Sequence, residues 1–124
     1  MADTYTMGVD IGSTASKCLI LKNGSAIAGS AIIPAGTGTS GPGKSVETAF
    51  SKAGLTRDDI AGLAATGYGR NTFTAADFTV SELSCHAAGV HAMFPDAKTV
   101  VDIGGQDLKA IRIGKGGALD NFLM

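Results

Sequence analysis

A segment near the start of the chain repeats near its end without a gap, and this repeat limits the fold more than any other feature. Residues 9–26 align with residues 101–118, and the identical pairs are Val9/Val101, Asp10/Asp102, Ile11/Ile103, Gly12/Gly104, Lys17/Lys109, Gly24/Gly116 and Ala26/Ala118. Both copies predict a strand, a tight Asp-x-Gly turn, a second strand, a glycine turn and a third strand. A hairpin unit duplicated at the two ends of one chain indicates two related lobes.

The Asp-x-Gly turns carry groups that suit a phosphate chain. Glycine at Gly12 and Gly104 lets backbone N–H groups approach an anion without a Cβ in the way. Lys17 adds a positive charge, and three hydroxyl groups lie before it in the sequence: Ser13, Thr14 and Ser16. The alternative, two ordinary hairpins that turn at glycine, stays open at this point.

The two aspartates of the repeat require a cation beside a phosphate. Asp10 and Asp102 would repel a polyphosphate unless a hard cation lay between the charges. Mg²⁺ suits phosphate sites with few carboxylates, and it usually keeps several of its waters. The sequence therefore predicts a magnesium nucleotide, with Asp10 and Asp102 as metal residues acting through water, and it predicts that these two carboxylates approach each other.

The remaining pattern predicts an α/β fold. Apolar runs predict strands over residues 5–11, 16–21, 26–33, 60–65, 78–80, 100–103, 108–113 and 118–124. Residues 36–43 predict a glycine-rich loop, and the helical spacing that follows it ends at Gly54. Thr56 and Asp59 have the spacing of a cap. A second helix is predicted over residues 81–94, with Ser81 as its cap, Pro95 after its end, and one apolar face made of Leu83, Ala87, Val90 and Phe94.

The composition excludes several classes of protein. Hydrophobic residues make up 44% of the 124 residues, the net charge is −1, and no basic cluster stands out. We therefore expect neither nucleic acid nor an anionic membrane surface as a partner. No apolar stretch reaches about 18 residues, and the start of the chain has no pattern of a secretory signal. Two cysteines make no disulfide framework, which favours a cytoplasmic protein.

Five motifs resemble one family in particular. They are GVDIGSTASKCLILKNG (Gly8 to Gly24), GTGTSGP (Gly36 to Pro42), LAATGYGRN (Leu63 to Asn71), SELSCHAAG (Ser81 to Gly89) and VVDIGGQDLKAI (Val100 to Ile111). Together they are similar to the ATP-dependent activators of 2-hydroxyacyl-CoA dehydratases and to the ATPase subunits of benzoyl-CoA reductase. These proteins belong to the superfamily of actin, sugar kinases and heat-shock chaperones.

The resemblance implies an actin-like, ribonuclease H-like ATPase fold, a mixed sheet with flanking helices. It places a first lobe at residues 1–97 and the first hairpin strands of a truncated second lobe at residues 98–124. Binding of ATP or ADP is then implied for Asp10, Gly12, Ser13, Thr14, Ala15, Ser16 and Lys17, and for Asp102, Gly104, Gly105 and Gln106 in the second loop. Gln106 is the candidate catalytic residue, because glutamines orient the attacking water in other nucleotide hydrolases.

The resemblance also implies a role in anaerobic metabolism. The whole protein is expected to be a homodimer that couples ATP hydrolysis to low-potential electron transfer into a dehydratase, through one iron–sulfur cluster. Family members are much longer, and their cluster cysteines and adenosine-binding part lie downstream. We therefore expect this chain to be an N-terminal fragment without a cluster or appreciable ATPase activity, which self-associates through its unpaired C-terminal strand.

Several alternatives remain open. A sugar- or acid-kinase relative needs a carboxylate base in the first lobe, and none of the central acids has such a setting: Glu47, Asp58, Asp59, Asp77 and Glu82. A nucleotide-sensing module without turnover is a further alternative. Cys85 and His86 are adjacent on a helix and cannot easily share one ion, so Cys85 is interpreted as a buried structural thiol. Cys18 is expected in the core and His91 on the helix surface, while Arg70 meets a phosphate or simply lies exposed.

Overall fold

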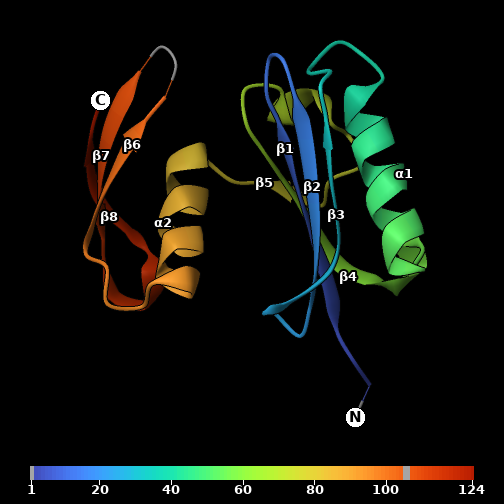
Figure 1. Ribbon diagram of the computed structural model, residues 1–124, viewed down its shortest axis with the longest axis horizontal. Helices are drawn as coiled ribbons and strands as arrows, with labels where there is room; N and C mark the ends of the chain where they lie inside the picture. Colours follow the sequence, from blue (N-terminus) through green and yellow to red (C-terminus); the bar gives the residue numbers. More distant parts are fainter. Residues whose placement is uncertain (1, 105–106) are drawn as a thin grey trace. The chain divides into compact units, whose positions relative to one another are not determined.

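The computed structural model describes residues 2–104 and 107–124, and it forms two compact units. The first unit ends at Val80 and the second spans Ser81–Met124. Each unit has its own sheet and its own hydrophobic core (Figure 1). None of the helices formed by the described residues is both long enough and apolar enough to span a bilayer.

A mixed five-stranded sheet forms the first unit. Its strands are β1 (Tyr5–Ile11), β2 (Ser16–Lys22), β3 (Ala26–Ile33), β4 (Ile60–Thr66) and β5 (Phe78–Thr79), in the order β3-β2-β1-β4-β5. Strands β1, β2 and β3 are antiparallel, whereas β4 lies parallel to both β1 and β5. The predicted turn between β2 and β3 is confirmed, since Asn23 (φ 53°) and Gly24 (φ 76°) both have the positive φ of a tight hairpin.

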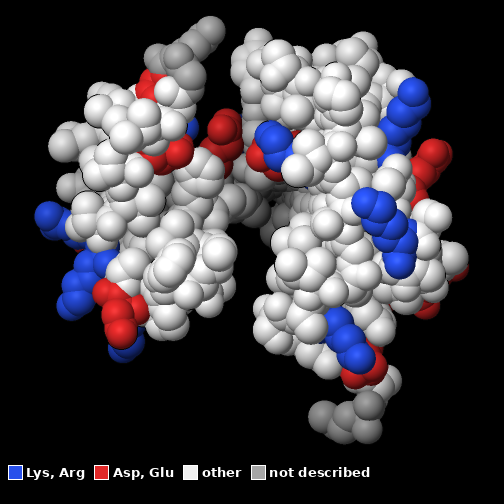
Figure 2. Space-filling model, viewed as in Figure 1, with Lys and Arg blue, Asp and Glu red and all other residues white. Residues whose placement is uncertain are grey.

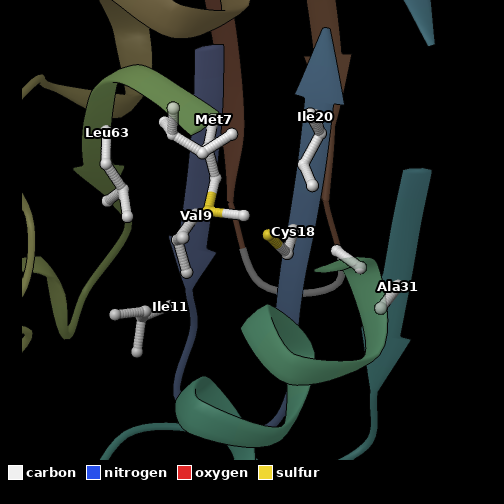
Figure 3. Packing of buried hydrophobic residues seen from close by; sticks show 9 residues of the cluster. Met7, Val9, Ile11, Cys18, Ile20, Ala31 and Leu63 are labelled. Carbon is white, nitrogen blue, oxygen red and sulfur yellow. The ribbon is translucent and has the colours of Figure 1, made fainter. Parts of the chain in front are cut away.

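The helix α1 (Gly41–Ala53) covers one face of this sheet. The core beneath it is built from β1–β4, and Figure 3 shows Val9, Cys18 and Ala31 side by side on neighbouring strands. Gly29 permits close packing, because a Cβ there would lie 2.6 Å from the Ala49 carbonyl oxygen of α1. Gly54 ends the helix with φ 67°, as predicted.

The loop predicted over residues 36–43 is too long. Helix α1 already begins at Gly41, with Pro42 in its first turn. Proline is compatible with this position because the first helical N–H groups have no partner within the helix. The glycines at residues 41 and 43 therefore belong to the first turn of α1 and not to the loop.

Two short 3₁₀ helices join the strands of the first unit: η1 (Arg57–Asp59) and η2 (Arg70–Thr72). The predicted cap before η1 is confirmed, since Asp59 Oδ2 accepts from the Thr56 N–H at 2.8 Å. Asp77 holds the segment just before β5 against β4 and η1, because its carboxylate accepts hydrogen bonds from Arg57 at 3.1 Å and from the Leu63 N–H at 2.8 Å.

The second unit contains α2 (Glu82–Met93) and the antiparallel strands β6 (Thr99–Ile103), β7 (Leu108–Ile113) and β8 (Leu119–Leu123), with η3 (Lys115–Gly117) between β7 and β8. Ser81 caps α2 as predicted, since its Oγ accepts from the Ser84 N–H at 3.2 Å. Ala87 of α2 packs on Ile111 and Ile113 of β7. The division predicted at residues 97 and 98 separates α2 from this sheet, whereas the packing of α2 groups it with the second unit.

Two side chains predicted for the second helix differ from the prediction. The sequence predicts Phe94 on the packed face, but it is 61% exposed because α2 ends at Met93 and Phe94 is no longer helical. The sequence predicts His91 on the surface, but it is half-buried against Gly117. A Cβ at Gly117 would lie 2.9 Å from His91 Cδ2, so the glycine makes room for the ring.

The sequence repeat is also a structural repeat. Asp10 pairs with Lys17 across β1 and β2, and Asp102 pairs with Lys109 across β6 and β7. The Gly12 N–H donates to Ala15 O and the Gly104 N–H donates to Asp107 O, both at 2.9 Å. Even the register irregularity recurs at the same offset, after Ile20 in β2 and after Arg112 in β7.

The Asp77 contacts predict a measurable contribution to stability. Asp77→Ala should lower the free energy of unfolding by about 1–3 kcal/mol, because the half-exposed ion pair contributes little and the Leu63 N–H would lose its partner. Urea unfolding of this variant measures the effect. Asp58→Ala, at an exposed position in the same region, is the control and should change stability by less than about 0.5 kcal/mol. Equal effects of the two variants would contradict the assigned role of Asp77.

Candidate functional site

Three loops meet at the carboxyl edge of the parallel pair β1 and β4. The turn after β1 (residues 12–15), the loop after β3 (residues 34–40) and the segment after β4 (residues 67–72) share backbone hydrogen bonds. The Thr37 N–H donates to Gly12 O at 2.9 Å, and the Gly69 N–H donates to Ile11 O at 2.8 Å. In open α/β sheets, ligands bind at the carboxyl ends of the strands, so this edge is the candidate site.

Glycine makes this convergence possible. A Cβ at Gly36 would collide with the backbone of Gly12 and Ser13, and one at Gly69 would lie 2.5 Å from Thr37 Oγ1. Gly67 has φ +93°, and a Cβ there would lie 2.5 Å from Asp10 Oδ1. The three loops therefore pack backbone on backbone against the end of β1.

The first Asp-x-Gly turn leaves most of its predicted groups accessible. Lys17 Nζ lies 3.4 Å from Asp10 Oδ2, and both side chains are half-exposed. Ser13 and Thr14 are exposed, and their N–H groups donate to no atom of the described residues. The Gly12 N–H is already bonded to the carbonyl oxygen of Ala15, which is half-buried and closes the turn.

Ser16 differs from its neighbours. Its side chain is fully buried, and its Oγ donates to the Ala35 carbonyl oxygen at 2.8 Å. The hydroxyl therefore fastens the loop after β3 to the start of β2, and it is not directed at a ligand. The sequence counted Ser16 with the exposed hydroxyl groups because its place in the strand alternation depends on which face α1 covers.

The second Asp-x-Gly turn is more enclosed. The Lys109 side chain is 13% exposed and lies 3.5 Å from both Asp102 and Asp107. Burial lowers the pKa of Lys109, but the carboxylates of Asp107 and Asp102 outweigh burial and raise it above its ordinary value. Gly104 is described, while Gly105 and Gln106 lie outside the described residues.

His86 lies next to Asp102 of the second hairpin, and the sequence did not predict this contact. His86 Nδ1 lies 3.6 Å from Asp102 Oδ2, the same oxygen that Lys109 approaches. Only the adjacency of Cys85 and His86 is visible in the sequence, because helical spacing does not show how α2 packs on the sheet of β6, β7 and β8. Cys85 is half-buried, so its interpretation as a buried thiol is wrong, whereas Cys18 is buried as expected.

The segment after β4 presents two further side chains. Arg70 Nη1 donates to the Gly67 carbonyl oxygen of its own loop at 3.0 Å, so part of the guanidinium is already bonded. Tyr68, which the sequence did not single out, is 77% exposed between Gly67 and Gly69. An exposed tyrosine gives no signal in the sequence, and Tyr68 is distinguished only by following Gly67, which packs on Asp10.

The donor set limits the kind of metal site. Among residues 2–104 and 107–124, no three or more His, Cys, Asp or Glu side chains cluster to hold a metal. A cation at Asp10 or Asp102 would therefore take most of its ligands from water and phosphate, which matches the preference of Mg²⁺. Asp10 and Asp102 lie in different units, so their predicted approach stays a prediction. Figure 2 shows acidic and basic side chains interspersed over the face drawn.

The duplicated turns and the α/β fold indicate a nucleotide-hydrolysing protein. Comparison with known proteins supports this class. Residues 7–124 match the model of the BadF/BadG/BcrA/BcrD ATPase family, so the chain belongs to this family.

Curated relatives extend the match. The chain is 53% identical over 120 residues to the 2-hydroxyisocaproyl-CoA dehydratase activator of Clostridioides difficile, covering 97% of this chain and 45% of the relative. It is 49% identical over 121 residues to the (R)-2-hydroxyglutaryl-CoA dehydratase activating ATPase of Acidaminococcus fermentans, covering 97% of this chain and 46% of the relative. The chain thus spans less than half the length of these relatives.

Solved structures confirm the predicted actin-like ATPase fold. Component A of the Acidaminococcus fermentans (R)-2-hydroxyglutaryl-CoA dehydratase superposes with a TM-score of 0.89 at 48% identity, over 96% of this chain and 46% of that one. The Clostridium difficile 2-hydroxyisocaproyl-CoA dehydratase activator with bound ADPNP superposes with a TM-score of 0.88 at 52% identity, over 97% of this chain and 45% of that one. YeaZ from Pseudomonas aeruginosa shares the fold alone, with a TM-score of 0.62 at 15% identity over 94% and 63%.

Gly67 tests the close packing at the site. Gly67→Ala should destabilise the protein by about 2–4 kcal/mol, because the new Cβ adds a collision with Asp10 and Ile11 to the strain of positive φ. Gly38→Ala is the matched control, since Gly38 has φ +79° but nothing within 4 Å of a Cβ, and should cost about 1 kcal/mol. Urea unfolding of both variants measures the difference. Equal losses would show that the Asp10 edge is not tightly packed.

The two cysteines should differ in reactivity. Burial raises the pKa of the Cys18 thiol from 9.0 to about 11, so thiolate is scarce in the folded protein. A thiol reagent at pH 8 should label Cys85 first and reach Cys18 only after unfolding, as peptide mass spectrometry would show. Because the unfolded thiol loses its proton at lower pH, the contribution of Cys18 to stability should fall between pH 9 and about 11. Equal labelling rates in the folded protein would contradict this assignment.

Proposed function

We propose that this chain forms the nucleotide-phosphate-binding part of an ATPase that activates a 2-hydroxyacyl-CoA dehydratase. The observation that carries the proposal is the duplicated Asp-x-Gly hairpin, with one Asp–Lys pair in each copy, on a chain of an ATPase family. Relatives at 48–53% identity are named as activators of such dehydratases, and the structure of one of them contains the ATP analogue ADPNP.

The first turn would bind the phosphate chain. The N–H groups of Ser13 and Thr14 and the Lys17 ammonium supply donors and positive charge, while Gly12 keeps the turn compact. Asp10 would hold Mg²⁺ through water, and the cation would neutralise charge between the carboxylate and the phosphates. Lys17 already lies beside Asp10, so the carboxylate is oriented before a cation arrives.

The second turn would complete the phosphate site. Asp102 is the second candidate magnesium residue, and Lys109 and His86 lie 3.5 and 3.6 Å from one of its carboxylate oxygens. Gly104 and Gly105 would allow close approach of the backbone to phosphate. Gln106 is proposed to orient the attacking water, by its resemblance to the family motif and by the role of glutamine in other nucleotide hydrolases.

The other partners belong to the whole protein. We propose a cytoplasmic homodimer that passes a low-potential electron to the dehydratase through an iron–sulfur cluster. Cys18 is buried in the core of the first unit, and Cys85 is half-buried on α2. Neither lies in a group of potential metal ligands within the described residues, so the cluster ligands are proposed to come from other parts of the whole protein.

The structure also bears on the kinase alternative. Asp77, one of the acids weighed as a possible base, is held by Arg57 and by the Leu63 N–H. A carboxylate engaged in this way is not free to accept a proton from a substrate hydroxyl. This observation argues against Asp77 as the base of a sugar or acid kinase.

The proposal predicts that both aspartates are needed for turnover. In the whole protein, Asp10→Asn and Asp102→Asn should each lower the rate of phosphate release from Mg-ATP by about 100-fold or more, since each removes a charge that helps to hold the metal. Asp58→Asn is the control and should keep the wild-type rate. Tight Mg-ATP binding by the wild-type protein without phosphate release would instead indicate a nucleotide-sensing module.

The 124-residue chain should bind Mg-ATP weakly, without appreciable turnover. The resemblance to the family assigns the adenosine contacts to a later part of the whole protein. Those contacts would contribute on the order of 5 kcal/mol to binding, so their loss corresponds to about three to four decades of affinity. Calorimetric titration of this chain and of the whole protein compares the two. Micromolar binding by the 124-residue chain would show that the nucleotide site is complete within it.

A further inference from the structure

The Thr66 hydroxyl lies beside the candidate phosphate site and has no role in the fold as described. Its Oγ1 is buried and has no hydrogen-bond partner among the described residues, whereas the rest of the residue is partly exposed. Leaving a buried hydroxyl without a partner destabilises a folded protein, and such groups are rare in native structures. An unpaired group of this kind calls for a physical explanation.

The position of Thr66 suggests that explanation. Thr66 is the last residue of β4 and the register partner of Asp10 in β1. Residues directly opposite each other on adjacent strands direct their side chains to the same face of a sheet, so both side chains project on the face opposite Val9 and Ala65. The two polar side chains are therefore neighbours at the carboxyl edge of the sheet.

The next residue holds this arrangement in place. Gly67 packs so closely on Asp10 that a Cβ there would lie 2.5 Å from Asp10 Oδ1 and 2.5 Å from Ile11 O. The loop beyond it is fixed by the Gly69 N–H, which donates to Ile11 O at 2.8 Å, and by the Thr72 hydroxyl, which donates to Gly69 O at 2.7 Å. The backbone of Thr66 is thus held beside Asp10, and rotation of the side chain about the Cα–Cβ bond is the movement that would bring its hydroxyl to a ligand there.

We propose that Thr66 is a positioning residue for the hydrated cation and phosphate group that Asp10 holds. Its hydroxyl would accept a hydrogen bond from a cation-bound water, or donate one to a phosphate oxygen, and so gain the partner that the free protein does not supply. This inference rests on the proposed nucleotide site at Asp10. It adds a residue outside both Asp-x-Gly turns to that site.

The first test measures the stability of the free protein. Thr66→Val keeps the shape of the side chain and removes the hydroxyl, so its urea midpoint should equal or exceed that of the wild type. Thr72→Val is the matched control, because the Thr72 hydroxyl has a protein partner, and it should lower the midpoint. A loss of stability in Thr66→Val as large as in Thr72→Val would mean that the Thr66 hydroxyl is already bonded, and would overturn the inference.

The second test measures ligand binding by the whole protein, because the 124-residue chain is expected to bind Mg-ATP too weakly for a further tenfold loss to be resolved. Calorimetric titration with Mg-ATP should give a dissociation constant about tenfold higher for Thr66→Val than for the wild type. Thr66→Ser keeps the hydroxyl and should bind within about twofold of the wild type. Repeating the titration with ATP and a chelator separates a contact with cation-bound water from one with phosphate, since only the latter persists without the metal.

The two readouts separate failure of this inference from failure of the proposed function. Equal Mg-ATP affinity of wild type and Thr66→Val would overturn the role of Thr66 and leave the site at Asp10 standing. Wild-type binding that is unaffected by Asp10→Asn would overturn the nucleotide site and this inference together. A more stable Thr66→Val that binds Mg-ATP about tenfold more weakly is the result that supports the inference.

Discussion

Close packing of backbone on backbone at the end of β1 is the constraint on which the rest of the candidate site depends. Two loops reach the Ile11–Ser13 backbone because Gly36, Gly67 and Gly69 have no Cβ to keep them away. This packing fixes the surroundings of Asp10, which has Gly67 on one side and Lys17 on the other. A loosely held turn would lose the advantage of preorganised charge, which is the main contribution a protein can make to phosphate chemistry.

The duplicated hairpin shows how one local structure acquires two environments. Both copies share their register, their turn hydrogen bond and their irregularity. In the first unit, α1 covers the face that carries Val9, and Asp10 stays half-exposed on the other. In the second unit, α2 covers the face that carries Asp102, so Lys109 is nearly enclosed and His86 approaches the carboxylate. The difference comes from which face receives the helix, not from the strands.

The family match and the geometry of the turns indicate the same class of reaction, nucleotide hydrolysis. The match over residues 7–124 establishes an ATPase family, and the geometry identifies which groups remain available to a phosphate. Ser13 and Thr14 have free N–H groups in the described part of the chain, whereas the Ser16 hydroxyl is committed to Ala35. Resemblance to the family motif alone implies the same phosphate-binding role for all three residues. The proposed dehydratase, electron transfer and dimer concern a protein about twice the length of this chain, since the chain covers 45–46% of its relatives.

Local signals in the sequence determined the strands, the Asn23-Gly24 turn, the Ser81 cap and the hairpin repeat, because each depends on residues close together in the chain. The sequence also predicted the two Asp-x-Gly turns, because the same spacing recurs in both copies of the repeat. Only the tertiary structure decided that Ser16 is buried, that Cys85 is not, and that His86 meets Asp102. It alone showed that the Thr66 hydroxyl, on the strand next to Asp10, is buried and has no partner among the residues that the structure describes. These features depend on which helix covers which face of a sheet and on which strands become neighbours, and residues far apart in the chain settle both.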